Sequence, residues 1–307
     1  MKPPTRRKSD WLLDRLWRGV LWCAMRLPYR VRLAVMGWLF RAIVGPATGR
    51  KAQALTNLKM IFPDMPDAER KRIASAVLDN VGRMVIESYT NDTLMERAEA
   101  WEPSGAGWPA VQAAQAEGRP ILFITGHFGN SQAARALLMR RGYRIGALYR
   151  PLSNDFLNDH YVATLADMGG AFARDRRGLA GFMKHLRSGA QGAILIDQYV
   201  YDGQIIDFMG HPAPTSVAAA EMALKYNALA VPVYSTRLDN GLDFRIEFED
   251  PIPHTDALSM TKAFNDSLSK RVFDAPEQWF WVHNRWKPER AEEAAAMAAR
   301  LAEGPGR

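Results

Sequence analysis

Cysteine is nearly absent from this sequence, and its scarcity excludes several kinds of chemistry. Cys23 is the only cysteine among the 307 residues. Neither an internal disulfide nor a cysteine-based metal cluster can therefore form, which suits a reducing compartment. Cys23 also lies in an apolar helical stretch, which argues against a thiol nucleophile.

Three common motifs of cofactor and nucleophile chemistry are missing as well. The sequence has no Gly-rich loop ending in Lys-Ser/Thr and no Gly-x-Gly-x-x-Gly after a strand, so nucleotide binding has little support. It also lacks Gly-x-Ser-x-Gly, which argues against an esterase of the α/β-hydrolase type. The histidines share no metal-ligand spacing. We therefore predict no metal and no cofactor.

Long uncharged runs are absent from residues 10–45. The longest are 19–25 and 33–40, whereas a membrane span needs about 20 mostly apolar residues. Apolar and charged residues recur instead with the spacing of an amphipathic helix. This pattern predicts either a helix lying in a membrane interface or an ordinary amphipathic helix packed on the core. One side of the helical wheel holds Leu13, Leu16, Trp17, Val20, Leu21, Ala24 and Leu27, and the other holds Asp14, Arg15, Arg18 and Arg26.

Positive charge is concentrated at the N-terminus. The formal net charge is +7, but residues 1–51 alone carry +10 and the remainder carries −3. Basic residues mixed with Trp and Leu favour an anionic membrane surface as a partner. A nucleic-acid binder, the alternative that the pI of 9.6 suggests, would spread its charge over a folded face and show steep salt dependence. We expect no nucleic-acid partner.

The remainder of the chain predicts an α/β fold. Residues 50–98 have a helical pattern, and from residue 120 short β-rich runs alternate with helical stretches. This alternation predicts a mixed, mostly parallel sheet flanked by helices, preceded by the amphipathic membrane-associating segment. The expected domains are 1–48, 49–290 and a helical tail over 291–307. The expected strands are Ile121–Thr125, Tyr143–Tyr149, Ala193–Tyr199, Val231–Leu238 and Phe244–Glu249, and the later helices are 154–167, 178–188, 215–227 and 256–273.

His127 is the most prominent candidate for chemistry. It follows a predicted strand, lies between Gly126 and Gly129, and precedes a helix that begins near Ser131. The glycines let the backbone approach a ligand closely, and N–H groups at the start of a helix can stabilise an anion. An imidazole here can accept a proton from a hydroxyl at neutral pH. The alternative is a histidine that only hydrogen-bonds the turn.

Several blocks of the sequence together resemble one enzyme family. Gly-His-Phe-Gly-Asn after a strand resembles the signature of the late lipid A acyltransferases, the lauroyl and myristoyl transferases of the lysophospholipid acyltransferase group. The order of the blocks over residues 50–288 also agrees with that family. The further blocks are Asn57-Leu58 with Phe62-Pro63, Tyr149-Arg150-Pro151 with Asn154, Asp197-Gln198 followed by Phe208, Gly210 and Thr215, and Pro276-Glu277-Gln278 with Trp281, His283, Arg285 and Lys287.

The resemblance implies acyl transfer in lipopolysaccharide biosynthesis. The donor would be an acyl-carrier-protein or acyl-CoA thioester, and the acceptor would be a hydroxyl of an acylated glucosamine lipid. His127 would act as the general base, and the tetrahedral oxyanion would be stabilised by N–H groups of the Gly-rich turn or by an arginine. The expected location is the cytoplasmic face of a bacterial inner membrane.

One position departs from the family pattern. The family has Asp or Glu five positions after the histidine, and Gln132 stands there in this sequence. An amide can orient an imidazole but cannot stabilise its charge. Three explanations stay open: another acid (Asp197, Asp155 or Asp202) replaces it, the activated thioester tolerates a neutral partner, or the chain is a non-catalytic paralogue that binds lipid or a partner.

The expected site therefore contains two groups of residues. The catalytic group is His127, Gln132 and Asp197, and the substrate-binding group is Gly129, Asn130, Arg150, Arg176, Gln198 and Arg285. The three arginines also have simpler interpretations, namely a surface ion pair, a solvated charge run and stacking on tryptophans. An acyltransferase of another lipid class, acting on a lysophospholipid, an aminolipid or a glycolipid, is the remaining alternative.

Overall fold

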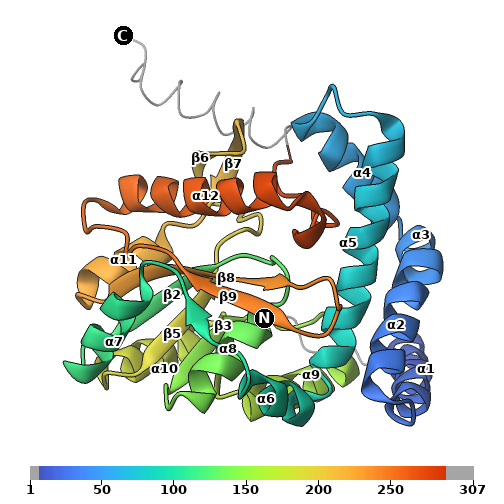
Figure 1. Cartoon of the computed structure of the whole chain (residues 1–307), viewed down its shortest axis with the longest axis horizontal. Coiled ribbons are helices and arrows are strands. Elements are labelled where there is room, and N and C mark those ends of the chain that lie inside the picture. Colours follow the sequence, from blue (N-terminus) through green and yellow to red (C-terminus); the bar gives the residue numbers. More distant parts are fainter. Residues whose placement is uncertain (1–6, 288–307) are drawn as a thin grey trace.

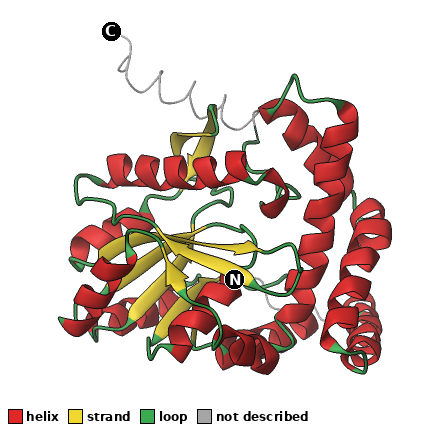
Figure 2. Ribbon diagram, viewed as in Figure 1, coloured by secondary structure: helices red, strands yellow, loops and turns green. Residues whose placement is uncertain are grey.

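The computed structural model describes residues 7–287, and a seven-stranded mixed sheet with helices on both faces forms its centre (Figures 1 and 2). The strand order is β1-β9-β8-β2-β5-β3-β4, and β6 and β7 form a separate antiparallel pair. The five strands from β8 to β4 are parallel, and β9 is antiparallel to β8. The predicted mixed, mostly parallel α/β fold is thus confirmed.

The elements have the following bounds. The strands are β1 (Pro103–Ser104), β2 (Ile121–Thr125), β3 (Ile145–Tyr149), β4 (Gly170–Ala173), β5 (Gln191–Leu195), β6 (Gln204–Phe208), β7 (His211–Thr215), β8 (Leu229–Arg237) and β9 (Phe244–Phe248). The helices are α1 (Lys8–Met25), α2 (Tyr29–Leu39), a π-helical turn (Phe40–Val44), α3 (Gly45–Ala47), α4 (Arg50–Ile61), α5 (Asp67–Glu87), α6 (Asn91–Ala98), α7 (Trp108–Ala116), α8 (Ser131–Arg140), α9 (Asp155–Asp167), α10 (Arg176–Arg187), α11 (Ala218–Lys225), α12 (Ala257–Asp274) and a 3₁₀ turn (Pro276–Gln278).

The two faces of β2 explain why this strand is apolar throughout. Leu122 and Ile124 belong to the core cluster that includes α10, α11 and α12, whereas Ile121 and Phe123 belong to the cluster on the other face with α7 and α8. A parallel strand covered by helices on both sides needs apolar residues at every position. The carboxyl ends of β2, β3 and β5 consequently meet at one edge of the sheet, where ligand sites of such folds lie.

The N-terminal helices pack against the long helix α5, at one side of the molecule in Figure 1. The predicted helical wheel of α1 is wrong in one respect, because Asp14 is fully buried between Arg15 and Arg18. Leu21 and Ala24 pack inward, while Leu13 and Leu16 are exposed. The predicted apolar side is therefore divided between the protein core and the surface.

No single helix within residues 7–287 is long and apolar enough to cross a membrane. One pair of helical segments, 29–47 and 50–61, passes a test of length and composition, but it is bent by 86°. The expected tail helix over 291–307 lies outside the described residues.

Candidate active site

His127 and Asp197 form a hydrogen-bonded pair at the carboxyl edge of the sheet. Thr125 and Leu195 end the neighbouring strands β2 and β5 in register, and each of the two site residues follows two positions later. His127 Nδ1 lies 2.8 Å from Asp197 Oδ1, and the His127 backbone N–H donates to Asp197 Oδ2 at 2.6 Å. The carboxylate therefore fixes Nδ1 as the protonated nitrogen, so that Nε2 is the unprotonated nitrogen and the one that can accept a proton.

Asp197 is a fully ionised carboxylate despite its burial. Burial alone would raise its pKa, but the charge of His127, the two hydrogen bonds from His127 and a third from Trp279 Nε1 at 2.9 Å together lower the pKa to about 2. A buried carboxylate that accepts several hydrogen bonds keeps its charge at neutral pH. It can therefore stabilise an imidazolium when His127 takes up a proton.

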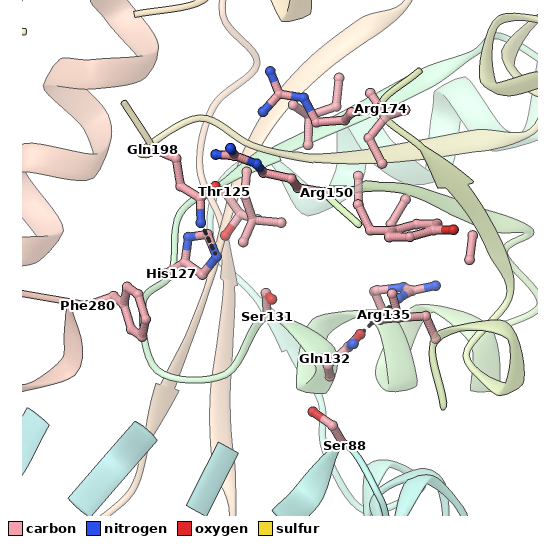
Figure 3. Close-up of a pocket in the computed structure, with 18 of the residues that line it drawn as sticks. Ser88, Thr125, His127, Ser131, Gln132, Arg135, Arg150, Arg174, Gln198 and Phe280 are labelled. Atoms are coloured by element: carbon pink, nitrogen blue, oxygen red, sulfur yellow. Dashed lines mark hydrogen bonds between the residues drawn. The ribbon is translucent and has the colours of Figure 1, made fainter. Parts of the chain in front are cut away.

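Three further side chains surround the imidazole. Gln198 places its amide nitrogen 3.4 Å from His127 Nε2, and the ring of Phe280 lies at a centroid distance of 5.2 Å (Figure 3). His283 accepts a hydrogen bond from the Tyr199 N–H at 3.0 Å, and burial lowers its pKa to about 4, so that it is neutral at physiological pH. The His127 side chain itself is 22% exposed and faces a cavity.

Two N–H groups of the Gly-rich turn, those of His127 and Gly129, already have hydrogen-bond acceptors within the protein. The Gly129 N–H donates to the Gln278 carbonyl at 2.8 Å, and the His127 N–H donates to Asp197. Gly129 has a positive φ of 55°, and a Cβ atom there would lie 1.7 Å from the Ser235 carbonyl oxygen. Glycine is thus required by close packing of the turn on β8.

A buried polar network anchors the turn to α5. Asn130 donates from Nδ2 to Glu87 at 2.7 Å, and Arg237 donates to both oxygens of Glu87 at 2.6 and 2.7 Å. Asn80 accepts from Arg237 and donates to the Gly129 carbonyl at 3.0 Å. The Asn130 side chain also caps α8, so it positions the turn. Asn130 also lines the cavity, and its predicted contact with substrate stays a prediction.

A cavity of about 1160 Å³ opens beside the imidazole. Its walls are mostly apolar, and they come from the carboxyl edge of the sheet together with α1, α5, α8 and α9. Its volume exceeds that of a typical small-ligand pocket of about 300–1,000 Å³. Its apolar lining includes Trp17, Val85, Leu138, Leu148, Leu157 and Leu165.

Gln132 does not contact His127. Its Oε1 accepts a hydrogen bond from Arg135 at 2.9 Å, and Figure 3 shows this pair on the cavity wall. Of the three acids that could replace the family's carboxylate, Asp197 contacts the imidazole, whereas Asp155 begins α9 and Asp202 is exposed in a turn. The histidine therefore has a carboxylate partner, Asp197, although position 132 holds a glutamine in place of the family's acid.

The three predicted arginines lie in different surroundings. Arg150 lines the cavity just after β3, together with Arg174 (Figure 3). Arg176 is exposed at the start of α10 and does not line the cavity. Arg285 is completely buried, donates to the Pro214 carbonyl at 2.6 Å and to Thr215 Oγ1 at 2.5 Å, and lies over Phe208. The structure therefore places neither Arg176 nor Arg285 on the cavity wall.

Sequence reasoning missed several residues of the site. Trp279 and Phe280 were part of an aromatic run without an assigned role, although they contact Asp197 and His127. Glu87 and Arg237 are 150 positions apart, and no local pattern connects them. A charged residue on the apolar side of a helix was an available signal for Arg135, which is 5% exposed.

The chain is similar in sequence to one family of known proteins. The sequence profile of the bacterial lipid A biosynthesis acyltransferases matches residues 2–288. A lipid A biosynthesis acyltransferase of Haemophilus influenzae is 24% identical over 87% of this chain and 86% of its own. The lipid A biosynthesis lauroyltransferase of Escherichia coli is 24% identical over 88% of this chain and 89% of its own. The palmitoleoyltransferase of Escherichia coli is 24% identical over 94% of this chain and 96% of its own. The chain belongs to the bacterial lipid A biosynthesis acyltransferase family.

Proposed function

We propose that this acyltransferase moves a fatty acyl group from an acyl-carrier-protein or acyl-CoA thioester to a hydroxyl of a lipid A precursor. The observation that carries the proposal is the His127–Asp197 pair beside the largely apolar cavity. A base whose unprotonated Nε2 lies beside the cavity suits an alcohol acceptor, and an apolar cavity suits an acyl chain. Each buried CH₂ group of the chain contributes about 0.8 kcal/mol, so cavity depth would set the preferred chain length.

The reaction needs no covalent enzyme intermediate. His127 Nε2 takes the proton of the acceptor hydroxyl, and the oxygen attacks the thioester carbonyl to form a tetrahedral oxyanion. The oxyanion then collapses, the carbon–sulfur bond breaks, and the imidazolium returns the proton to the departing thiolate. Asp197 stabilises the imidazolium between these two proton transfers.

We assign the oxyanion to side-chain donors because the N–H groups of His127 and Gly129 already donate within the protein. Gln198 carries an amide N–H group 3.4 Å from the reacting nitrogen of His127. Arg150 lines the same cavity just after β3, at the carboxyl edge of the sheet, and is the cationic candidate. Preorganised donors of this kind stabilise developing charge by about 3–4 kcal/mol each.

The non-catalytic alternative loses its main motivation. It rested on Gln132, and Asp197 occupies the position beside Nδ1 that an orienting acid must have. Acyl transfer to another class of lipid would need the same base and the same apolar cavity. Experiment must therefore distinguish the acceptors.

We further propose that the N-terminal helices dock on the cytoplasmic surface of the bacterial inner membrane. Their exposed side chains are unusually apolar, and Trp17 of the same helix α1 lines the cavity. A lipid acceptor could thus pass from the bilayer to His127 without crossing open water. The exposed apolar residues are Trp11, Leu12, Leu13, Leu16, Trp22, Met25, Val31, Val35, Trp38 and Ile43.

Two measurements test the proposal. Mass spectrometry of membrane lipids from a deletion strain should show lipid A with one acyl chain fewer, and the purified protein should restore that chain from an acyl-carrier-protein or acyl-CoA donor. An unchanged lipid A together with an altered phospholipid or aminolipid would assign the protein to another acceptor class. Binding to vesicles containing anionic lipid should weaken when Trp11, Leu16 and Trp22 are replaced by Gln, and unchanged binding would contradict the docking surface.

A further inference from the structure

Arg135 is a buried cation on the cavity wall without an acidic partner. It is 5% exposed and lines the cavity from α8. Its two terminal nitrogens donate to neutral oxygens, the Gln132 side chain and the Met168 carbonyl. Within residues 7–287 no Asp or Glu forms an ion pair with it, and its Nε–H has no hydrogen-bond partner. A buried charge in such surroundings is normally paired.

The whole cavity has charge of one sign. Among the described residues that line it are Arg135, Arg150 and Arg174, and none of the lining residues is Asp or Glu. Burial lowers the pKa of Arg135 to about 10, so its guanidinium is still charged at neutral pH. Arg150 and Arg174 are exposed to water, whereas the buried Arg135 would remain uncompensated beside a purely apolar ligand.

Gln132 explains why Arg135 is unpaired. The two residues are three positions apart on α8 and already share a hydrogen bond. A glutamate at position 132 would form an ion pair at this spacing and neutralise the guanidinium. The amide holds the arginine in position and leaves its charge available to a ligand.

We infer that Arg135 and Gln132 form an anion subsite of the cavity that binds a phosphate ester. The inference rests on the proposed function, since the ligand is a substrate of the same cavity. A phosphate ester keeps at least one negative charge at neutral pH, and its oxygens accept charge-assisted hydrogen bonds from a guanidinium. The phosphate belongs either to the lipid acceptor or to the pantetheine arm of the donor, because both are phosphate esters attached to ligands of this reaction.

The test is a calorimetric binding comparison on the full chain in the absence of turnover. Monododecyl phosphate is titrated below its micellar concentration, and the uncharged tetraethylene glycol monododecyl ether serves as the matched ligand. Wild type should prefer the phosphate, and Arg135→Met should reduce this preference about ten- to a hundredfold, as expected for a charge-assisted hydrogen bond. Gln132→Glu should reduce it similarly, because the new carboxylate competes for the guanidinium.

Arg140→Met is the matched control, since this residue lies on the same helix but pairs with Glu99 outside the cavity. It should leave the phosphate preference unchanged. A parallel titration with 4′-phosphopantetheine assigns the source of the phosphate: dependence on Arg135 there places the donor arm at the subsite, and dependence with dodecyl phosphate alone places the lipid there. If Arg135→Met fails to fold, Gln132→Glu still provides the test.

A phosphate preference that survives both substitutions would overturn the inference, as would the absence of any preference in wild type. The outcome is separable from the proposed function because binding needs no proton transfer. His127→Ala should retain the Arg135-dependent preference. A wild-type protein that binds the phosphate but transfers no acyl group would therefore contradict the proposed function and leave the anion subsite intact.

Discussion

At the scale of single residues, the account depends on which carboxylate faces His127. The hydrogen bond from Nδ1 to Asp197, 2.8 Å long, gives the imidazole the same kind of partner that an acid gives in a serine-protease triad. In such a triad, replacing the acid by its amide lowers turnover about 10⁴-fold, because the imidazole is then held in the wrong tautomer. The comparison sets the size of the effect expected here.

We expect Asp197→Asn to lower kcat about 10³- to 10⁴-fold, because the amide can no longer stabilise the imidazolium. Adding Gln132→Glu to this variant should give no rescue, since position 132 contacts Arg135. Asp202→Asn, an exposed acid of the following turn, is the control and should keep wild-type turnover. Rates from single-turnover acyl transfer decide the matter, and rescue by Gln132→Glu would contradict the assignment.

The residue scale is also where prediction from sequence was least complete. His127, Asp197, Gln198 and Arg150 could be placed near one another because each follows a parallel strand. Arg285 could not be placed, because its role depends on Pro214 and Thr215, which reach it only through the folded β6–β7 pair. The sequence around an arginine that is flanked by tryptophans does not distinguish a contact with a ligand from a contact with a strand.

At the scale of elements, the catalytic turn owes its shape to α5. The Glu87–Arg237 pair is buried on both sides, with side-chain exposures of 0% and 7%, and it also holds Asn130. The sequence predicted a helical region here but gave no sign of this long-range contact. Asn57 of α4 makes a comparable link, since its Nδ2 donates to the carbonyls of Trp281 and His283. Both links attach the helices α4 and α5 to the α/β domain.

We expect Glu87→Gln to lower the free energy of unfolding by about 3–5 kcal/mol, because it leaves the buried Arg237 charge uncompensated. Glu69→Gln, which removes an exposed pair with Arg72 on the same helix, should leave the free energy of unfolding nearly unchanged. Urea denaturation of both variants measures the difference. Equal effects of the two substitutions would show that the buried network does not stabilise the fold.

The expected strands and helices agree with the observed ones where a local pattern existed. The Asn240-Gly241 turn does connect an antiparallel pair, β8 and β9. The predicted carboxyl end of the third strand was wrong, because β5 ends at Leu195. The chain then turns, and Asp197 hydrogen-bonds to His127. The β4 strand and the β6–β7 pair were missed, since the first has only four residues and the second contains two prolines.

At the scale of the whole molecule, burial of a neutral histidine makes stability depend on pH. His283 has its pKa lowered to about 4 by burial, so the unfolded chain binds a proton more readily than the folded chain does. The contribution of the neutral His283 ring to the free energy of unfolding is therefore fully present above about pH 6.5. It is lost as the pH falls toward 4.

We expect His283 to lower the free energy of unfolding by about 2 kcal/mol when the pH falls from 6.5 to 4. This value includes a reduction because water reaches part of the ring. Denaturant titrations of wild type and His283→Gln at both pH values isolate the effect, with His211→Gln as a control on the surface hairpin. A pH dependence of equal slope in wild type and His283→Gln would rule out this origin.

The most direct test of the central claim is the single-turnover rate of acyl transfer to a lipid A precursor by wild type and by His127→Ala. We expect measurable transfer by wild type and a loss of at least about 10³-fold in the variant, because the variant lacks the imidazole that is paired with Asp197. Transfer by His127→Ala at the wild-type rate would contradict this expectation.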